Sequence, residues 1–247
     1  MKKLILSLLI IIWFGLPGFS QKITKQSLLA TYKQKMELAK KYNDVVGYKT
    51  ALFDIISLEG TGSVYMDTLA DYYFKSGELV SFILLTDDLI EKRPDDMNLL
   101  LKQAVAYENL GNRKEAVKLY EQIYSRQPDN MNVGFQLAWN QYQLKRIEEA
   151  NQTLMSMKDK KFPEKVMVLM PGVKNKNEQV PLKAAYYNLL GLVSYDLHNL
   201  DAAIQYFDEA LKIYPPFDMA KQNKAALELM KKKLESEPEK QETKPKK

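Results

Sequence analysis

The sequence predicts an all-α protein built from consecutive pairs of helices, and three observations support this prediction. The same residue types return every 34 positions: Ala70, Ala104 and Ala138 are related in this way, and so are Pro94 and Pro128. Within each repeat, apolar residues recur at the spacing of one helix face. A turn signal divides each repeat in two. A fixed period of this length is the sequence signature of a repeat architecture.

The repeat at 97–130 shows the pattern most clearly. Leu100 and Ala104 stand at i and i+4 on one face of its first helix. Gly111 is expected to end that helix, because glycine tolerates the left-handed backbone that follows a helix. Asn112, followed three residues later by a glutamate, is the expected N-cap of the second helix. Small alanines in both helices would let the pair approach closely.

We expect five such units followed by one further helix. The boundaries of the units are 29–62, 63–96, 97–130, 131–162 and 184–217. The last helix, 218–235, has one apolar edge and would cover the exposed end of the stack. An insertion at 158–183 precedes the fifth unit. We interpret it either as an ordinary surface loop or as a lid or partner-contact loop.

Residues 97–128 and 184–215 resemble the tetratricopeptide repeat. The second segment carries the motif at Tyr187, Leu190, Gly191, Ala203, Phe207, Ala210 and Pro215. The resemblance implies a right-handed superhelical solenoid of about five tetratricopeptide-like helix pairs plus a C-terminal capping helix. Four residues depart from the pattern. Phe82 stands where the family prefers a small residue, Gly134 replaces a large apolar one, and Lys145 and His198 replace the turn glycine.

The two ends of the chain differ from the repeats. Lys2 and Lys3 precede the apolar run 4–14, then come helix breakers and the small residue Ser20. This order is typical of a secretory signal peptide, so we expect cleavage of residues 1–20. A retained N-terminal membrane anchor is the alternative. No later segment is apolar enough to span a bilayer, so no stable membrane insertion is expected after cleavage.

At the other end, residues 236–247 contain Pro, Glu, Lys and Gln but no apolar side chain. This composition predicts a disordered tail.

Composition argues against an enzyme. There is no Cys, and His198 is the only His. Thiolate metal sites, cysteine nucleophiles and multi-histidine sites are therefore excluded. No known catalytic motif is present, so we expect a non-enzyme with no cofactor and no metal. Residues 21–230 contain 27 basic and 27 acidic residues. A nucleic-acid partner is not expected, because it would require basic residues concentrated on a folded face.

The resemblance implies a binding surface, because in this family the first helices of successive units line a concave groove that holds partner peptides. Carried over by register, the groove would contain Asp67, Asp71, Leu101, Val105, Glu108, Phe135, Trp139, Tyr142, Asn188, Leu192 and Tyr195. An aromatic centre with an acidic end suits a peptide with apolar anchors and a basic flank. A clamp for a terminal carboxylate is not expected, because the first unit offers two Asp. Alternatively Phe135, Trp139 and Tyr142, here called the aromatic row, are packing residues covered by the insertion.

Two functional hypotheses follow. The first is a non-catalytic protein–protein interaction scaffold of the bacterial cell envelope, located in the periplasm, that binds a partner peptide or protein in the groove. The alternative is a structural subunit of a larger envelope assembly, contacting partners through its convex face and its tail. An open aromatic row favours the first hypothesis and a filled one favours the second. The partner and the oligomeric state stay open.

Overall fold

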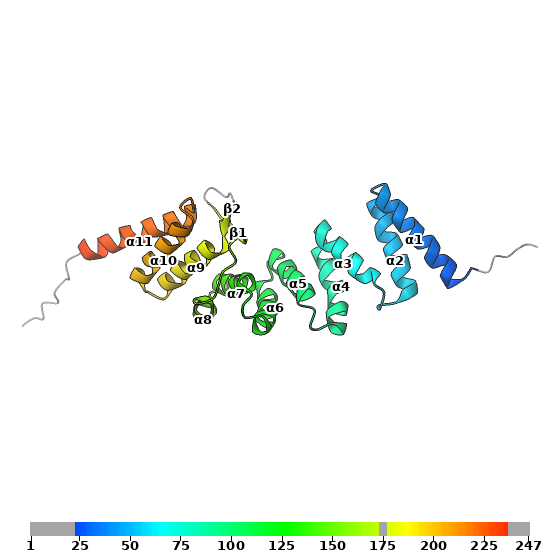
Figure 1. The fold of residues 1–247 in the computed structure, drawn as a ribbon, viewed down its shortest axis with the longest axis horizontal. Coiled ribbons are helices and arrows are strands. Elements are labelled where there is room, and N and C mark those ends of the chain that lie inside the picture. Colours follow the sequence, from blue (N-terminus) through cyan, green and yellow to red (C-terminus); the bar gives the residue numbers. More distant parts are fainter. Residues whose placement is uncertain (1–22, 173–176, 237–247) are drawn as a thin grey trace, which may run out of the picture. The chain divides into compact units, whose positions relative to one another are not determined.

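The structure is a computed structural model that describes residues 23–172 and 177–236 (Figure 1). The expected signal peptide, residues 1–20, lies outside the described residues. Of the expected tail, 236–247, only Ser236 is described, and it is the last residue of a helix rather than part of a tail.

Within the described residues the chain forms eleven helices and one antiparallel pair of strands (Figure 1). The helices are α1 (Lys25–Lys41), α2 (Val45–Glu59), α3 (Tyr65–Ser76), α4 (Leu79–Lys92), α5 (Met97–Asn109), α6 (Arg113–Arg126), α7 (Met131–Gln143), α8 (Ile147–Met157), α9 (Leu182–Asp196), α10 (Leu200–Ile213) and α11 (Asp218–Ser236). The strands are β1 (Met167–Pro171) and β2 (Asn177–Pro181). The predicted fold class, five consecutive helix pairs and a last helix, is confirmed.

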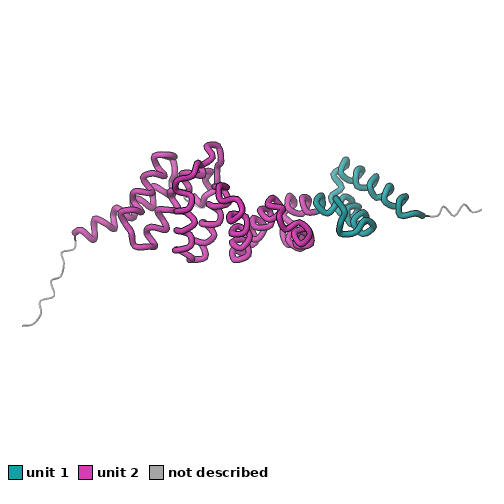
Figure 2. The backbone as a smooth tube through the Cα atoms, turned by 60° about the horizontal axis from the view of Figure 1, so that its bottom comes forward, with its two compact units in different colours: residues 1–69 teal, residues 70–247 magenta. Residues whose placement is uncertain are grey.

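The chain divides into two compact units, residues 1–69 and 70–247 (Figure 2). In the first unit, α1 packs against α2. Met36 and Ala39 of α1 and Leu52 and Ile55 of α2 are buried. In each helix the two buried residues are three positions apart, so they lie on one face. Burial of these two faces against each other keeps the helices together.

In the second unit, α5, α6 and the start of α7 enclose one apolar cluster. Ala104 of α5 and Ala116 of α6 are fully buried in it, beside Tyr120. Small residues at these two places leave room for the Tyr120 ring, whose hydroxyl donates a hydrogen bond of 2.9 Å to Glu108. A second and larger cluster joins α7, α8, the hairpin, α9, α10 and α11.

The turns within the helix pairs use a left-handed residue whether or not it is glycine. Gly77 and Gly111 have φ of 76° and 77°, and Lys145 and His198 both have φ of 61°. Lys145 and His198 therefore keep the backbone conformation of the turn glycine, although a residue with a side chain is strained at positive φ.

Three helices of the second unit are capped as their sequence suggests. Side-chain oxygens of Asp96, Asn130 and Asn199 accept hydrogen bonds from the backbone N–H of Leu99, Val133 and Ala202. Asn112 does occupy the N-cap position of α6, but the predicted capping hydrogen bond is wrong. Its ψ is 63°, against 82–88° at the three residues that do cap, and its side chain makes no hydrogen bond to the first turn.

The other departures from the repeat pattern have a packing reason. Phe82 is buried against Phe74, with ring centroids 5.0 Å apart. Gly134 makes room for Tyr124, because a Cβ there would lie 2.8 Å from that ring. At Gly134 the ring of Tyr124 occupies the volume that a larger residue would fill, and at position 82 the ring of Phe82 itself is packed into the core.

The insertion is a β-hairpin, which corrects the expectation of a loop. Val168 of β1 pairs with Val180 of β2, and Met170 pairs with Glu178. Because alternate residues of a strand point to opposite faces, Val168, Met170 and Val180 all lie on one face. That face is buried in the larger cluster, so the hairpin packs on the repeats.

Candidate functional site

The aromatic row lies on α7, and one end of it is buried in the cluster that also includes the hairpin. Phe135 is only 2% exposed and belongs to the same cluster as the inner face of the hairpin. Trp139 and Tyr142 are partly buried and pack against that cluster. The ring centroids of Phe135 and Trp139 are 6.5 Å apart, and those of Trp139 and Tyr142 are 6.4 Å apart. The row is therefore core at one end and accessible at the other.

A pocket of about 510 Å³ opens beside Trp139 and Tyr142. We call it the hairpin pocket, because the β1–β2 hairpin supplies one of its walls. Its lining comes from α6, α7, the hairpin, α9 and α11, and consists of Arg113, Trp139, Tyr142, Gln143, Leu169, Pro171, Asn177, Leu192, Met219 and Asn223. Pockets of this size accommodate side chains of a bound ligand.

Tyr142 has a polar partner at the edge of the pocket. Burial, assisted by the negative charge of Asp196 and a hydrogen bond to it, raises the pKa of Tyr142 to about 12. The hydroxyl, like that of any tyrosine, is protonated at neutral pH, and the Asp196 carboxylate favours this protonated form further. The Nζ of Lys145 lies 5.5 Å from the centroid of the Tyr142 ring, where it makes a cation–π contact.

Among the described residues that line the pocket, Arg113 is the one cation. It is the first residue of α6 and is partly buried. Its Nε is buried and has no hydrogen-bond partner. No carboxylate in the described part of the chain forms an ion pair with it. A buried donor without a partner is destabilising, because it has lost its hydrogen bonds to water. An acceptor on a bound ligand would restore a hydrogen bond.

Of the eleven predicted groove residues, the structure brings Trp139, Tyr142 and Leu192 together in the hairpin pocket. Asn188 is fully buried between α9 and α11, where it accepts a hydrogen bond of 3.3 Å from Asn223. Tyr195 is 40% exposed and does not line the pocket.

The expected acidic end of the groove is already partnered. Asp71 pairs with Lys102 at 2.7 Å, and Glu108 accepts the hydrogen bond from Tyr120. Leu101 and Val105 are partly buried on α5. Asp67 belongs to the other compact unit. The acidic residues therefore give little reason to expect a basic flank on the ligand.

The sequence analysis missed Arg113, although the repeat contains a signal for it. Stepping by the repeat from Arg113 leads to Leu79, Ile147 and Leu200, which are all apolar. Arg113 is thus a charged residue at a position that otherwise takes an aliphatic one. Such local exceptions to a folding pattern concentrate at functional sites. The hairpin and α11 residues of the pocket have no repeat equivalents, so no comparable signal existed for them.

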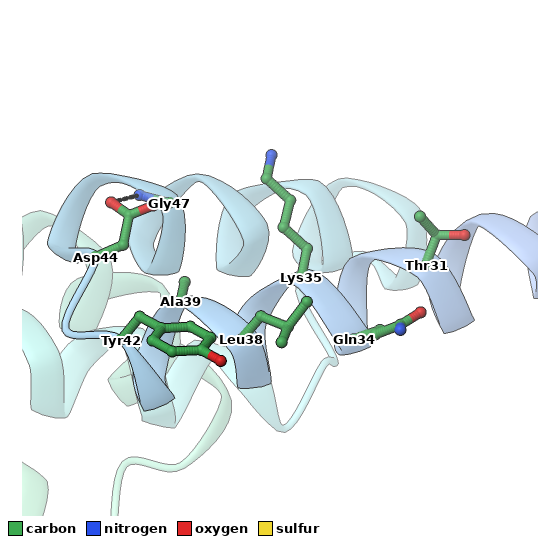
Figure 3. A pocket seen from close by; sticks show the side chains of 8 residues that line it. All are labelled: Thr31, Gln34, Lys35, Leu38, Ala39, Tyr42, Asp44 and Gly47. Atoms are coloured by element: carbon green, nitrogen blue, oxygen red, sulfur yellow. Dashed lines mark hydrogen bonds between the residues drawn. The ribbon is translucent and has the colours of Figure 1, made fainter.

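The first unit has a hollow of its own, of about 590 Å³ (Figure 3). It is lined by Thr31, Gln34, Lys35, Leu38, Ala39, Tyr42, Asp44 and Gly47. Figure 3 shows Asp44 turned to the backbone of Gly47, whose N–H donates to it at 2.9 Å to cap α2. The hollow contains none of the predicted groove residues. Its polar groups include a structural cap, and no orphaned donor or acceptor marks it as a site.

The described part of the chain has neither a candidate metal site nor a candidate membrane span. No group of three or more His, Asp or Glu side chains there could hold a metal ion. None of the described helices has the length and apolar character that a bilayer crossing requires.

Comparison with known proteins identifies the repeats. Residues 109–164 and 184–217 each match a family model described as tetratricopeptide repeat. The chain therefore contains tetratricopeptide repeats, as the resemblance implied. No curated protein sequence matched the chain.

Solved structures of repeat proteins are similar in fold. One is YrrB, titled a TPR protein with an unusual peptide-binding site, at 13% identity and a TM-score of 0.59, covering 78% of this chain and 90% of that one. Another is MamA, at 13% identity and a TM-score of 0.56; the match covers 76% of this chain and 92% of MamA. A third is MamA from Desulfovibrio magneticus RS-1, at 11% identity and a TM-score of 0.55, covering 79% and 99%. At such identities the likeness concerns the fold alone.

Proposed function

We propose that this tetratricopeptide-repeat chain is a non-catalytic protein–protein interaction scaffold of the bacterial cell envelope, and that it binds a partner segment in the hairpin pocket. The observation that carries the proposal is the accessible end of the aromatic row. Trp139 and Tyr142 stay partly exposed in a pocket of about 510 Å³, although their neighbour Phe135 is buried in the apolar core. Trp and Tyr are the residues most enriched among interface anchors.

The lining chemistry supports protein binding over small polar ligands. Trp139, Leu192 and Met219 present apolar surface from three helices. Polar groups stand among them, as at interfaces where an apolar centre has a polar rim. Had the row been filled completely, assembly through the convex face would be the better hypothesis. Because one end of the row is open, we favour binding of a partner segment in the hairpin pocket.

Location in the envelope rests on residues 1–20, whose charge, apolar run and small residue are those of an export signal. We propose that the mature chain begins near Gln21 and works in the periplasm. N-terminal sequencing of protein purified from its native cells tests this. An intact Met1 would contradict it.

Capture of partners from native envelope fractions tests the binding proposal. Immobilised wild-type protein is compared with Trp139→Ala and with Lys118→Ala, an exposed change on α6 as the matched control. We expect Trp139→Ala to lose the captured partner and Lys118→Ala to retain it. Circular dichroism at the capture temperature establishes that each variant is folded. Equal capture by a folded Trp139→Ala variant would contradict the proposal.

A further inference from the structure

We propose that the segment held in the hairpin pocket carries an acidic side chain next to apolar residues, and that Arg113 binds the carboxylate. This inference rests on the proposed function and specifies its partner. It reverses the charge expected from the sequence, which suggested a basic flank.

The first argument is the position of Arg113. The equivalent residues of the second, fourth and fifth repeats, Leu79, Ile147 and Leu200, are partly buried and aliphatic. The equivalent of the first repeat, Val45, is also aliphatic but 51% exposed. Ile147 and Leu200 pack against apolar clusters of the second unit. A charged side chain at this place forgoes that packing, so a structural role alone does not account for it.

The second argument is the unsatisfied donor. The guanidinium cannot lose its charge at any ordinary pH, and its planar fork matches a carboxylate. Its Nε is buried without a hydrogen-bond partner at the edge of an apolar pocket. A carboxylate is the acceptor that would satisfy both the charge and the geometry.

The acidic groups near the pocket do not meet this need. Asp196 is engaged by the hydroxyl of Tyr142 and does not line the pocket. Glu178 has a buried Oε2 without a partner. It pairs across the hairpin with Met170 and so shares the face that is buried in the core. Asn177, its neighbour, belongs to the opposite face and lines the pocket.

The third argument is the length of the apolar surface that lines the pocket. Trp139, Leu192 and Met219 come from α7, α9 and α11. Packed helices lie 8–10 Å apart, so three of them span roughly 20 Å, the length of about six residues in an extended chain. The occupant is therefore an extended segment with apolar side chains on the wall and its acidic residue at the α6 side.

We assign the carboxylate to an Asp or Glu side chain within the segment and not to a chain terminus. Arg113 offers one orphaned donor. The amide of Asn223 uses one of its two N–H groups on Asn188, so it has only one left for a ligand.

An array of hexapeptides tests the inference. Each peptide has Phe or Leu alternating with Ser, and has Asp, Asn or Lys at its first or last position. All peptides are acetylated, and each is made both as the C-terminal amide and with a free C-terminal carboxylate. Binding of the labelled full chain is measured on the array, and dissociation constants are then measured by fluorescence anisotropy. We expect the Asp peptides to bind about tenfold more tightly than the Asn peptides, the scale of one hydrogen bond to a charged group.

Variants assign that preference to Arg113. Arg113→Leu introduces the residue that equivalent repeat positions carry, so the fold should tolerate it. We expect it to remove the difference between Asp and Asn peptides while apolar binding remains. Trp139→Ala should weaken both peptides alike.

The outcomes separate the two proposals. Equal binding of Asp and Asn peptides that is lost in Trp139→Ala overturns the acidic-segment inference and leaves the pocket proposal standing. Binding only by peptides with a free C-terminal carboxylate also overturns it, in favour of a terminus. Absence of binding by every peptide overturns it too, and capture from envelope fractions then decides the proposed function separately. A preference for Asp that survives Arg113→Leu means that another group binds the carboxylate.

Discussion

A single methyl group added at Gly191 tests how closely α9 and α10 pack. A Cβ at this position would lie 2.5 Å from Cε1 and 2.7 Å from Cδ1 of the Phe207 ring, where ordinary contacts begin at 3.4 Å. The ring would have to retreat by almost 1 Å. It is 1% exposed and is held in a cluster with Ala203 and Leu227, so it has little room to do so.

Two effects of Gly191→Ala oppose each other. Helix propensity alone would stabilise the protein by about 1 kcal/mol. Overpacking of a tight core costs about 1–3 kcal/mol. With most of a 1 Å overlap against a buried ring, the steric cost should win, leaving a net destabilisation of about 1–2 kcal/mol. For a chain of this size, that lowers the melting temperature by about 2–8 °C.

Thermal unfolding followed by circular dichroism measures the change. Lys183→Ala, an exposed change on the same helix, serves as the control and should shift the free energy of unfolding by no more than about 0.5 kcal/mol. Combining Gly191→Ala with Phe207→Leu should show favourable coupling, because the ring that clashes is gone. A rise in melting temperature for Gly191→Ala alone would refute the packing argument.

Three further predictions concern the turns, the aromatic row and the hairpin. Lys145→Gly and His198→Gly should each raise the free energy of unfolding by about 0.5–1 kcal/mol in urea titrations, since both residues have φ of 61°; a loss of stability would contradict the strain argument. Tyr142 should stabilise the fold below pH 10 and lose that contribution as the pH rises towards 12, because the unfolded state releases the proton first. Stability measured from pH 9 to 12 should therefore fall less steeply in Tyr142→Phe. Val180→Ala, on the buried face of the hairpin, should cost about 2 kcal/mol, whereas Gln179→Ala, on the exposed face, should cost almost nothing; equal effects in thermal melts would contradict the register of the strands.

The helix pairs were predictable because the period of 34 repeats itself along the chain. The same repeat position is occupied by Ala70, Ala104 and Ala138, so the evidence for one helix supports the next. The turn positions followed from the same register, even where Lys145 stands in place of glycine.

The hairpin was not predictable in the same way. From Val166 to Met170 every residue is apolar, so the sequence lacks the alternation that marks a strand with one buried face. In the structure Leu169 lines the pocket and is 62% exposed, while its neighbours Val168 and Met170 are buried. The outer face of β1 is apolar because it forms a wall of the pocket. Only the tertiary structure shows this wall, so the sequence could not predict it.

The candidate site was half predictable for a related reason. Trp139, Tyr142 and Leu192 follow from repeat register. Met219 and Asn223 reach the pocket only because α11 packs beside α9, and the sequence cannot show which side chains of a terminal helix face back.

The hairpin also changes how the chain should come apart. Stacked repeats normally contact only their neighbours, so they can open one unit at a time from an end. Here a single apolar cluster runs from Met131 on α7 to Ala220 on α11 and includes the hairpin, and the Tyr186 hydroxyl donates to the backbone oxygen of Leu154 on α8. Helices α7 to α11 are thereby joined into one cooperative block. Their slowest amide hydrogens should exchange through a common opening, whereas α5 and α6, whose buried cluster includes Val133 and Leu137 of α7 but no other residue of the block, should open more readily. Apart from Arg113 on α6, the described lining of the pocket belongs to this block, so most of its wall should keep its shape between binding events.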